Sequence, residues 1–334
     1  MILKKIKEDV NYYKNNKKEL LYIIIPIIIA IIMVIPVPYV YSVGGGIIKI
    51  DKNIHVQDEY KSEGSLNCAY VSEVNGNVFI YLISKVAGFN SYKKENLTLD
   101  NETLKEYSYR ERLYFENSID NAIFVAYNKA GKKIDIKNTK YYVLYVDPSA
   151  QTELKTNDEI LEVEGAAIED LSYIKSLIEE KEDVKIKVLR DGKEIETISR
   201  VQTVNNKKVL GVYLTEKYDY KLEKAIDMEF TSKEAGPSGG LMLALSIYNK
   251  LVEEDITKGK KLVGTGTIDK DGNVEEISGI KYKLKGAVKN DADVFIVPKE
   301  NYDEALRVKK KNKYDIKIIS VSSFDEALEK LKNL

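Results

Sequence analysis

The chain is organised around the stretch Glu234-Ala235-Gly236-Pro237-Ser238-Gly239-Gly240-Leu241, which continues through Met242 to Leu251. Small residues surround a single serine, and the apolar residues that follow repeat at helical spacing, so the pattern predicts a helix that begins beside Ser238. The first backbone N–H groups of a helix lack partners within it, and together with the helix dipole they favour negative charge by roughly 0.3–1 kcal/mol. Ser238 is therefore either an ordinary helix cap or a nucleophile beside a site suited to an oxyanion.

A second informative stretch runs from Lys261 to Ala287. Residues 263–268 predict a strand, Asp271-Gly272 a turn, and residues 277–284 the opening of another helix. The apolar stripe of that helix consists of Ile280, Leu284, Ala287 and Val288. Lys281 falls on the flank of this stripe, whereas the other lysines lie further from its centre: Lys283, Lys285 and Lys289. We therefore expect Lys281 to be the partly buried lysine.

Three motifs follow one another along the chain: Gly-Pro-Ser-small-Gly before a helix, Thr-Gly on a strand, and Gly-Ile-Lys-x-Lys before the next helix. Motifs of this kind in this order resemble the proteolytic domain of Lon-type serine proteases. The resemblance implies that Ser238 is the nucleophile, that Lys281 is the general base and that Thr265 orients the lysine amine. Backbone groups near the serine would hold the oxyanion, at Gly236, Pro237 and Gly239. The chain departs from the family at Ala235, often acidic, and at Gly239, often alanine.

A serine–lysine pair requires a lysine with a lowered pKa, whichever family the protein belongs to. Lysine titrates near pH ~10.4, so a lysine base at neutral pH needs its pKa lowered by about three units, or roughly 4 kcal/mol. Burial shifts the pKa in that direction. Other nucleophilic mechanisms could draw only on His55 and Cys68, the single histidine and the single cysteine. No cluster of His and Cys ligands is present, so we expect neither a metal nor a cofactor.

Leu20 to Val43 form an uncharged, almost continuously apolar run. A run of roughly 20 apolar residues is long enough to cross a bilayer, whereas the apolar core of a cleaved signal peptide is usually about 7–15 residues. Six lysines precede the run and only Lys49 and Lys52 follow it closely. These features predict a cytoplasmic tail at 1–19, a retained transmembrane anchor at 20–43 and an extracellular remainder. A cleaved signal peptide and a buried core helix are the alternatives.

The region 44–137 is expected to be the N-terminal part of an extracellular protease domain. Residues 65–86 read as a hairpin that turns at Asn75-Gly76, and residues 111–129 as a helix with one apolar face. Within the hairpin, Cys68 is expected to be a small core residue rather than a reactive thiol.

The region 138–204 changes character. It predicts a strand at 142–146, a turn at 147–150, a strand at 158–165, a helix at 170–180 and a hairpin at 184–198. This order, with Pro148-Ser149-Ala150 before a strand that Asp158 opens and Gly165 ends, resembles a bacterial PDZ domain. The resemblance implies a groove between the first strand and the helix, where an extended peptide end adds as a strand. The strand edge of this groove would be formed by Tyr142, Val143, Leu144 and Tyr145. The alternative is a small mixed domain without a ligand.

The order of these segments is similar to that of the membrane-anchored PDZ–Lon-type proteases of Gram-positive bacteria. The expected fold is α/β (α+β): a single transmembrane helix, then a Lon-type proteolytic domain, 44–137 and 205–334, with an inserted PDZ-like unit. No Gly-x-x-x-x-Gly-Lys-Ser/Thr occurs, so no ATPase motor is expected.

The expected function is an ATP-independent, membrane-anchored serine endopeptidase that cleaves unfolded or membrane-associated extracellular proteins. The PDZ-like unit would bind substrate or gate access. A silent membrane-tethered PDZ adaptor and a non-proteolytic serine–lysine acyl hydrolase remain alternatives. A net charge of −1 without a basic patch argues against a nucleic-acid partner. Family resemblance implies a hexameric homo-oligomer.

Overall fold

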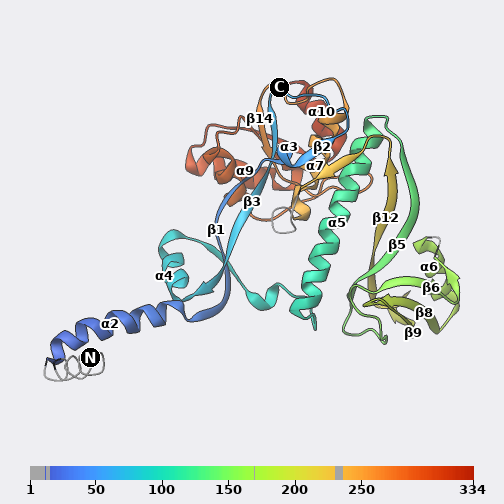
Figure 1. Cartoon of the computed structure of the whole chain (residues 1–334), viewed down its shortest axis with the longest axis horizontal. Coiled ribbons are helices and arrows are strands. Elements are labelled where there is room, and N and C mark those ends of the chain that lie inside the picture. Colours follow the sequence, from blue (N-terminus) through green and yellow to red (C-terminus); the bar gives the residue numbers. More distant parts are fainter. Residues whose placement is uncertain (1–11, 13–15, 169, 230–235) are drawn as a thin grey trace, which may run out of the picture. The chain divides into compact units, whose positions relative to one another are not determined.

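Figure 1 shows the computed structural model, which describes residue 12 and residues 16–168, 170–229 and 236–334. The chain divides into two compact units, one of Met1–Val43 and Ser72–Leu97, the other of Gly44–Val71 and Thr98–Leu334. Glu234, Ala235 and most of the predicted cytoplasmic tail lie outside the described residues.

The larger unit is built on a mainly parallel sheet. Strand β14 (Lys261–Gly264) pairs in parallel with β3 (Ser65–Asn77) and with β15 (Val294–Pro298), which pairs in parallel with β16 (Lys317–Val321). In the smaller unit, residues of β1 (Pro36–Ile48) pair in antiparallel orientation with β4 (Asn90–Lys93).

Alternate residues of the central strands enter two separate cores. Leu262 and Ile296 belong to the core that contains residues of α5 (Leu104–Lys129), α7 (Gly240–Leu251) and α10 (Phe324–Lys332). Val263 and Phe295 belong to the core that contains residues of α8 (Ile280–Lys289) and α9 (Tyr302–Asn312). Since strand side chains alternate between faces, helices cover both faces of this sheet, and the expected α/β class is confirmed. Short elements complete this unit: α3 (Ile50–Asn53), β2 (Ile54–Val56), β13 (Ile226–Met228) and the 3-10 turns η2 (Pro237–Gly239) and η3 (Lys299–Asn301).

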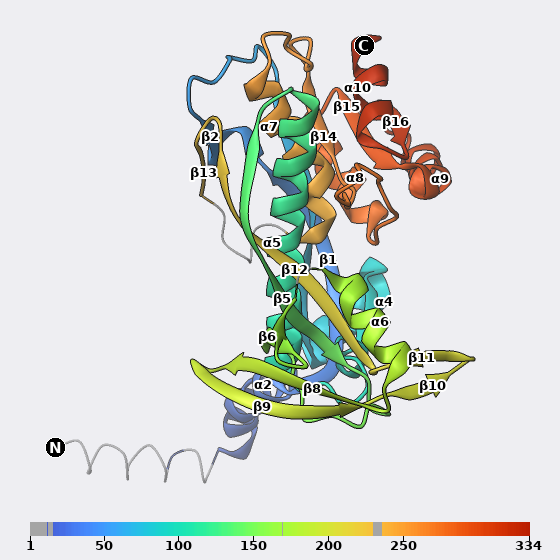
Figure 2. The ribbon, with the colours of Figure 1, turned by 90° about the vertical axis from the view of Figure 1, so that its right-hand side faces the viewer.

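Helix α5 matches the prediction for residues 111–129 and begins earlier. Thr103 and Glu106 form a reciprocal capping box at its start, because the Thr103 hydroxyl accepts from the Glu106 N–H and the Glu106 carboxylate accepts from the Thr103 N–H. Figures 1 and 2 show α5 beside α7 and along the ribbon made by β5 (Ile134–Val146) and β12 (Val212–Leu222). These two strands run from the core that contains α5, α7 and α10 into the PDZ-like part.

The PDZ-like part has its own core, in which Val143, Val163, Val184 and Val188 are fully buried. Its sheet follows the order β12-β5-β6-β8-β9, with β6 at Glu159–Val163, β8 at Asp183–Arg190 and β9 at Lys193–Arg200. Helix α6 (Leu171–Glu180), the short β7 (Ala166–Ala167) and the hairpin of β10 (Gln202–Val204) and β11 (Lys207–Val209) complete it. The predicted helix and hairpin are confirmed.

The predicted hairpin over residues 65–86 is wrong. Strand β3 continues through Asn75-Gly76 to Asn77, and residues Val78–Ala87 form helix α4 instead of a returning strand. Gly76 allows close packing rather than a turn, because a β-carbon there would lie 2.6 Å from the Tyr41 ring. The Asn77 side chain caps the helix by accepting from the Ile80 N–H at 2.8 Å. A short apolar run fits either a strand or a helix, and here the cap favours the helix.

The apolar run at 20–43 is not one helix. Helix α2 covers Lys17–Val34, and β1 begins at Pro36, so the second part of the predicted anchor is a strand. The helix ends at Val34 because the next residue, Ile35, precedes Pro36 and has an extended backbone with ψ 124°. Among the described residues, no helix has the length and apolar character needed to cross a membrane.

Candidate active site

Ser238 lies in η2, directly before α7. Its carbonyl oxygen accepts from the Gly266 N–H at 2.7 Å and from the Thr265 hydroxyl at 3.0 Å. Leu241 N–H donates in turn to the Gly266 carbonyl at 3.1 Å. The segment after β14 therefore holds the backbone of Ser238 and of Leu241 by hydrogen bonds. The Ser238 side chain is partly exposed.

The amine that reaches Ser238 belongs to Lys283. Lys283 Nζ lies 2.9 Å from Ser238 Oγ and 3.0 Å from Thr265 Oγ1, with both contacts in hydrogen-bonding geometry. The Lys283 side chain is buried and the Thr265 side chain is fully buried. Three polar side chains from η2, the end of β14 and α8 thus meet at one point.

Burial lowers the pKa of Lys283 to about 8. Removing an ammonium group from water disfavours its charged form, and neither neighbouring hydroxyl carries a negative charge to offset that cost. A neutral amine beside a serine hydroxyl can accept its proton, so this arrangement provides a nucleophile and a base at neutral to slightly alkaline pH.

The prediction that Lys281 is the buried lysine was wrong. Its side chain is exposed, and its Nζ lies over the Tyr282 ring, 5.1 Å from the centroid. Helix α8 buries a second face besides the apolar stripe, since a β-carbon on Gly286 would lie 2.7 Å from Gly46 N. The buried arc is therefore centred nearer Lys283 than the stripe alone indicated. The sequence held one indication of this second buried face. A glycine within the helix, Gly286, and the Gly44-Gly45-Gly46 run lack side chains, so the two segments can approach closely.

The prediction that backbone groups at Gly236, Pro237 and Gly239 hold the oxyanion stays a prediction. Pro237 has no N–H, and the Gly239 N–H donates to the Gly236 carbonyl at 3.0 Å. The Gly240 N–H donates to Pro237. In this arrangement the Gly239 N–H is occupied, so an oxyanion could use it only after η2 had changed conformation.

Helix α5 supplies residues near the serine whose positions the sequence did not predict. Ser118 Oγ lies 3.4 Å from the Pro237 carbonyl oxygen, to which it donates, and a β-carbon on Gly240 would lie 2.8 Å from Ser118 Oγ. The Asn121 amide donates to the Ile268 carbonyl at 3.1 Å. These contacts tie the start of α7 and the segment after β14 to α5.

Cys68 lies beside the site from β3. A β-carbon on Gly239 would lie 3.1 Å from Cys68 Sγ, so the sulfur occupies the space next to the residue after the serine. The thiol is buried, and burial raises its pKa to about 11, which keeps it protonated at neutral pH. Its expected role as a small core residue is consistent with this environment.

The predicted peptide-binding edge at Tyr142–Tyr145 is wrong, because both edges of this part of β5 are occupied. Val143 pairs with Leu214 of β12, and on the other side Tyr142 pairs with Glu159 of β6. Val143 N–H also donates to the Asp158 carbonyl at 2.9 Å. An added strand would find no backbone groups to pair with there.

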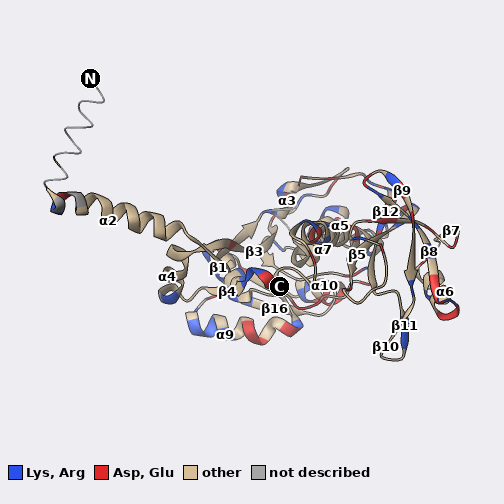
Figure 3. Cartoon of the chain, turned by 90° about the horizontal axis from the view of Figure 1, so that it is seen from below, with Lys and Arg blue, Asp and Glu red and all other residues tan. Residues whose placement is uncertain are grey.

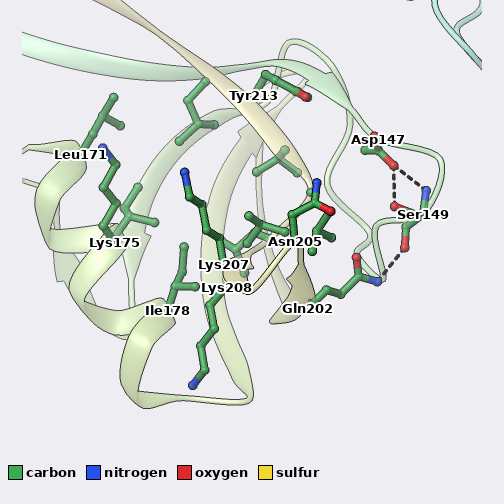
Figure 4. Close-up of a pocket in the computed structure, with 17 residues that line it drawn as sticks. Asp147, Ser149, Leu171, Lys175, Ile178, Gln202, Asn205, Lys207, Lys208 and Tyr213 are labelled. Carbon is green, nitrogen blue, oxygen red and sulfur yellow. Dashed lines mark hydrogen bonds between the residues drawn. The ribbon is translucent and has the colours of Figure 1, made fainter.

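A groove of about 630 Å³ lies instead between α6 and the start of β12 (Figure 4). Its apolar wall is formed by Leu171, Ile174, Ile178, Val209, Leu210, Val212 and Leu214. Gly211 has φ +70° and packs against Ala150, since a β-carbon there would lie 2.7 Å from that of Ala150. The predicted turn at 147–150 therefore supports this groove rather than a groove along β5.

The polar rim of the groove is mainly basic, with Lys175, Lys207 and Lys208 against a single acid, Asp147. The Asp147 carboxylate accepts from the Ser149 N–H at 2.9 Å and from its hydroxyl at 2.5 Å. Lys208 Nζ donates to the Glu179 carbonyl at 2.8 Å. In the part of the chain that the structure describes, Lys175 and Lys207 form no ion pair, so the rim presents positive charge.

Comparison with protein-family models gives two matches. Residues 225–333 match the Lon protease (S16) C-terminal proteolytic domain, and residues 121–199 match a PDZ domain. The first match contains Ser238, Thr265 and Lys283, whereas the second ends before β12. A comparison with curated proteins finds no match.

Proposed function

Because the chain carries a Lon-type proteolytic domain of the S16 serine peptidases together with a PDZ domain, we propose that it is an ATP-independent endopeptidase with Ser238 as nucleophile and Lys283 as general base. The observation that supports the dyad best is the 2.9 Å contact between Lys283 Nζ and Ser238 Oγ. ATP independence rests on the sequence, whose 334 residues hold no phosphate-binding-loop motif.

In the proposed reaction, neutral Lys283 accepts the Ser238 proton while Oγ attacks the carbonyl carbon of the scissile peptide bond. The resulting ammonium returns this proton to the leaving amine, which leaves an acyl-serine. The same lysine then activates water for hydrolysis of the ester. Thr265 holds the amine in place by accepting from it and donating to the Ser238 carbonyl. The proposed oxyanion donor is the Gly239 N–H, which η2 would have to release from the Gly236 carbonyl.

The PDZ groove is proposed to receive the extended C-terminal end of a protein substrate. Strand β12 lies at the end of the sheet order, and α6 faces it across the groove, so a peptide could add as a strand to β12. The apolar wall fits an apolar side chain, and the lysine rim favours acidic residues in the same peptide. The groove would thereby select or position substrates for Ser238.

The proposed location is the outer face of the cell membrane, with the N-terminus in the cytoplasm and residues 1–43 as the attachment. This part rests on the sequence: lysines precede the uncharged run at 20–43. Substrates would then be unfolded or membrane-associated extracellular proteins. A hexameric ring is proposed by family resemblance alone.

The test uses the full chain in detergent with a reduced, unfolded protein as substrate. We expect cleavage by the parent, none by Ser238→Ala, and a loss of at least about 10²-fold for Lys283→Met, since positioned bases contribute 10²–10⁴-fold. Lys281→Met is the matched control, because it removes a lysine of the same helix two residues away. Equal loss in both lysine variants would contradict the assignment of the base.

A non-catalytic PDZ adaptor is the second candidate, and it rests on the groove rather than on the dyad. It is supported if the folded parent fails to cleave peptides at any protein concentration while still binding them. A small ester hydrolysed without any peptide cleavage would favour an acyl hydrolase instead.

A further inference from the structure

Two helices of the smaller unit, α2 and α4, pack against each other and share an apolar surface. The exposed large apolar residues of α2 are Leu21, Tyr22, Ile23, Ile24, Ile25, Ile27, Ile28, Ile29, Ile31, Ile32 and Val34. Those of α4 are Phe79, Tyr81, Leu82, Ile83 and Val86, the last of them 92% exposed. No residue of α4 is buried. We call this set the α2/α4 surface.

The exposed apolar side chains lie on all sides of the two helices rather than along one stripe. Three consecutive residues of α2, Ile23 to Ile25, are exposed, and consecutive residues point in directions about 100° apart. On α4, Tyr81 and Ile83 point to different sides of the helix, and both are exposed. A protein partner covers one face of a helix, whereas lipid covers every face, so this pattern favours lipid.

Several polar groups of α4 have partners within the chain, and the Val78 N–H at the start of the helix donates to the Ile35 carbonyl at 3.0 Å. The Ser84 hydroxyl donates to the Tyr81 carbonyl at 2.7 Å, and the Lys85 ammonium lies 5.0 Å from the centroid of the Tyr81 ring. Gly88 N–H donates to the Ser84 carbonyl at 2.9 Å, which closes the helix. In a bilayer, backbone and hydroxyl groups have to find such internal partners because water is absent.

Charge is confined to the margin of the α2/α4 surface, as Figure 3 shows. Residues 74–84 carry no charged side chain, and Lys85, Lys93 and Lys94 follow without an intervening acid. Lys93 pairs with Glu95 at 2.8 Å. Lys85 and Lys94 can therefore meet anionic headgroups while the apolar part of α4 enters below them, as lysines on interfacial helices do.

We propose that α4 is a second lipid-binding element, which lies in the headgroup and upper acyl region of a bilayer beside α2. A helix of about 15 Å is too short to cross a membrane but suits insertion parallel to its surface. This inference rests on the proposed membrane attachment through residues 1–43. It adds that the chain touches the bilayer at two points, so the smaller unit lies at the membrane surface.

The test uses tryptophan as a local reporter, because the chain contains none. Three full-chain variants each carry one tryptophan: Val86→Trp on α4, Tyr22→Trp on α2, and Leu306→Trp on α9 as the control in the larger unit. Each is reconstituted with vesicles of phosphatidylglycerol and phosphatidylcholine, with and without lipids brominated along the acyl chain. Each is also measured in detergent micelles and in a lipid-free amphipathic polymer.

We expect Val86→Trp and Tyr22→Trp to emit at shorter wavelength in vesicles than in the polymer and to lose at least half of their intensity to brominated lipid. Leu306→Trp should change in neither respect. Quenching of Tyr22→Trp without quenching of Val86→Trp would overturn the role of α4 while leaving the attachment intact. Quenching of neither would overturn both. A short-wavelength emission of Val86→Trp in the polymer, with a dimer in sedimentation, would show that a second copy covers α4.

A charge substitution gives an independent check. Leu82→Glu should reduce quenching of a tryptophan at position 86 by several-fold, because a carboxylate resists insertion among acyl chains. Lys94→Glu should weaken the effect only in vesicles that contain phosphatidylglycerol. Unchanged quenching in the Leu82→Glu protein would contradict insertion of α4.

Discussion

Lys281 and Lys283 stand two residues apart on α8 and project to different sides of it: Lys283 is buried against Ser238, and Lys281 is exposed beside the Tyr282 ring. At about 100° per residue, two positions differ by roughly 200° around a helix. The helix can therefore place only one of these lysines at the serine. The packing of α8 against Gly45 and Gly46 selects Lys283.

The first prediction concerns the form of the base. Lys283→Arg keeps a positive charge and a long side chain, but its guanidinium stays protonated, so turnover should fall by at least about 10²-fold. Lys281→Arg should leave kcat/KM within about twofold of the parent, as expected for an exposed position. Initial rates of peptide cleavage measure both, and retained activity in Lys283→Arg would exclude the lysine as base.

The second prediction is a pH profile. The pKa of Lys283 is lowered to about 8, and only the neutral amine can accept a proton. Activity should therefore rise with pH, by about tenfold per unit below the midpoint, and level off above about 8. The measurement is kcat/KM from pH 6 to 10 on a peptide without titrating groups. A profile flat across this range would contradict a lysine base.

The third prediction concerns packing between Cys68 and Gly239. Gly239→Ala places a methyl group against Cys68 Sγ, where the contact would be 3.1 Å, and should lower the free energy of unfolding by about 1–3 kcal/mol. Cys68→Ala removes the sulfur and leaves room for that methyl group. The double variant should thus recover part of the loss, with a coupling energy of about 0.5–3 kcal/mol. Strictly additive effects in urea unfolding would show that the two residues do not touch.

The fourth prediction concerns the PDZ groove. A peptide with an apolar C-terminal residue and acidic residues before it should bind more weakly to Lys175→Glu and Lys207→Glu than to the parent. A matched uncharged peptide should bind all three alike, because only the acidic peptide meets a reversed charge. Fluorescence anisotropy of labelled peptides provides the measurement. Gly211→Val should abolish binding of both peptides, since φ +70° and the nearby Ala150 leave no room for a branched side chain.

The fifth prediction concerns Asp120 of α5, whose carboxylate accepts from the Tyr220 hydroxyl at 2.9 Å. Burial raises the pKa of Asp120 to about 6, so the folded state binds a proton more tightly than the unfolded state. Its contribution to stability is complete below about pH 4 and is lost as the pH rises through 6. For the parent, this contribution to the free energy of unfolding should fall by up to roughly 3 kcal/mol between pH 4 and pH 8. Asp120→Asn should not show this decrease. Parallel unfolding curves for parent and variant at all pH values would refute it.

Local pattern and composition were enough to predict several parts of the molecule. The spacing of apolar residues after Ser238 predicted α7. Thr265 was expected within a strand at 263–268, but the observed strand ends at Gly264 and Thr265 follows it, beside the amine. The Lon resemblance implied a serine–lysine pair, and the composition limited the alternatives to His55 and Cys68. The strand, helix and hairpin order of residues 142–198 predicted the PDZ-like part, and the matched family models agree.

Tertiary structure decided which of several equivalent residues faces which neighbour. Lys283 rather than Lys281 is buried because a distant glycine run packs on a second face of α8. The groove beside α6 lies along β12 rather than β5, because residues 212–222, far along the chain, occupy the edge that β5 would otherwise expose. Both outcomes depend on contacts between segments distant in sequence. A periodic pattern identifies one buried face of a helix or strand, but only the fold shows which segments cover its other faces.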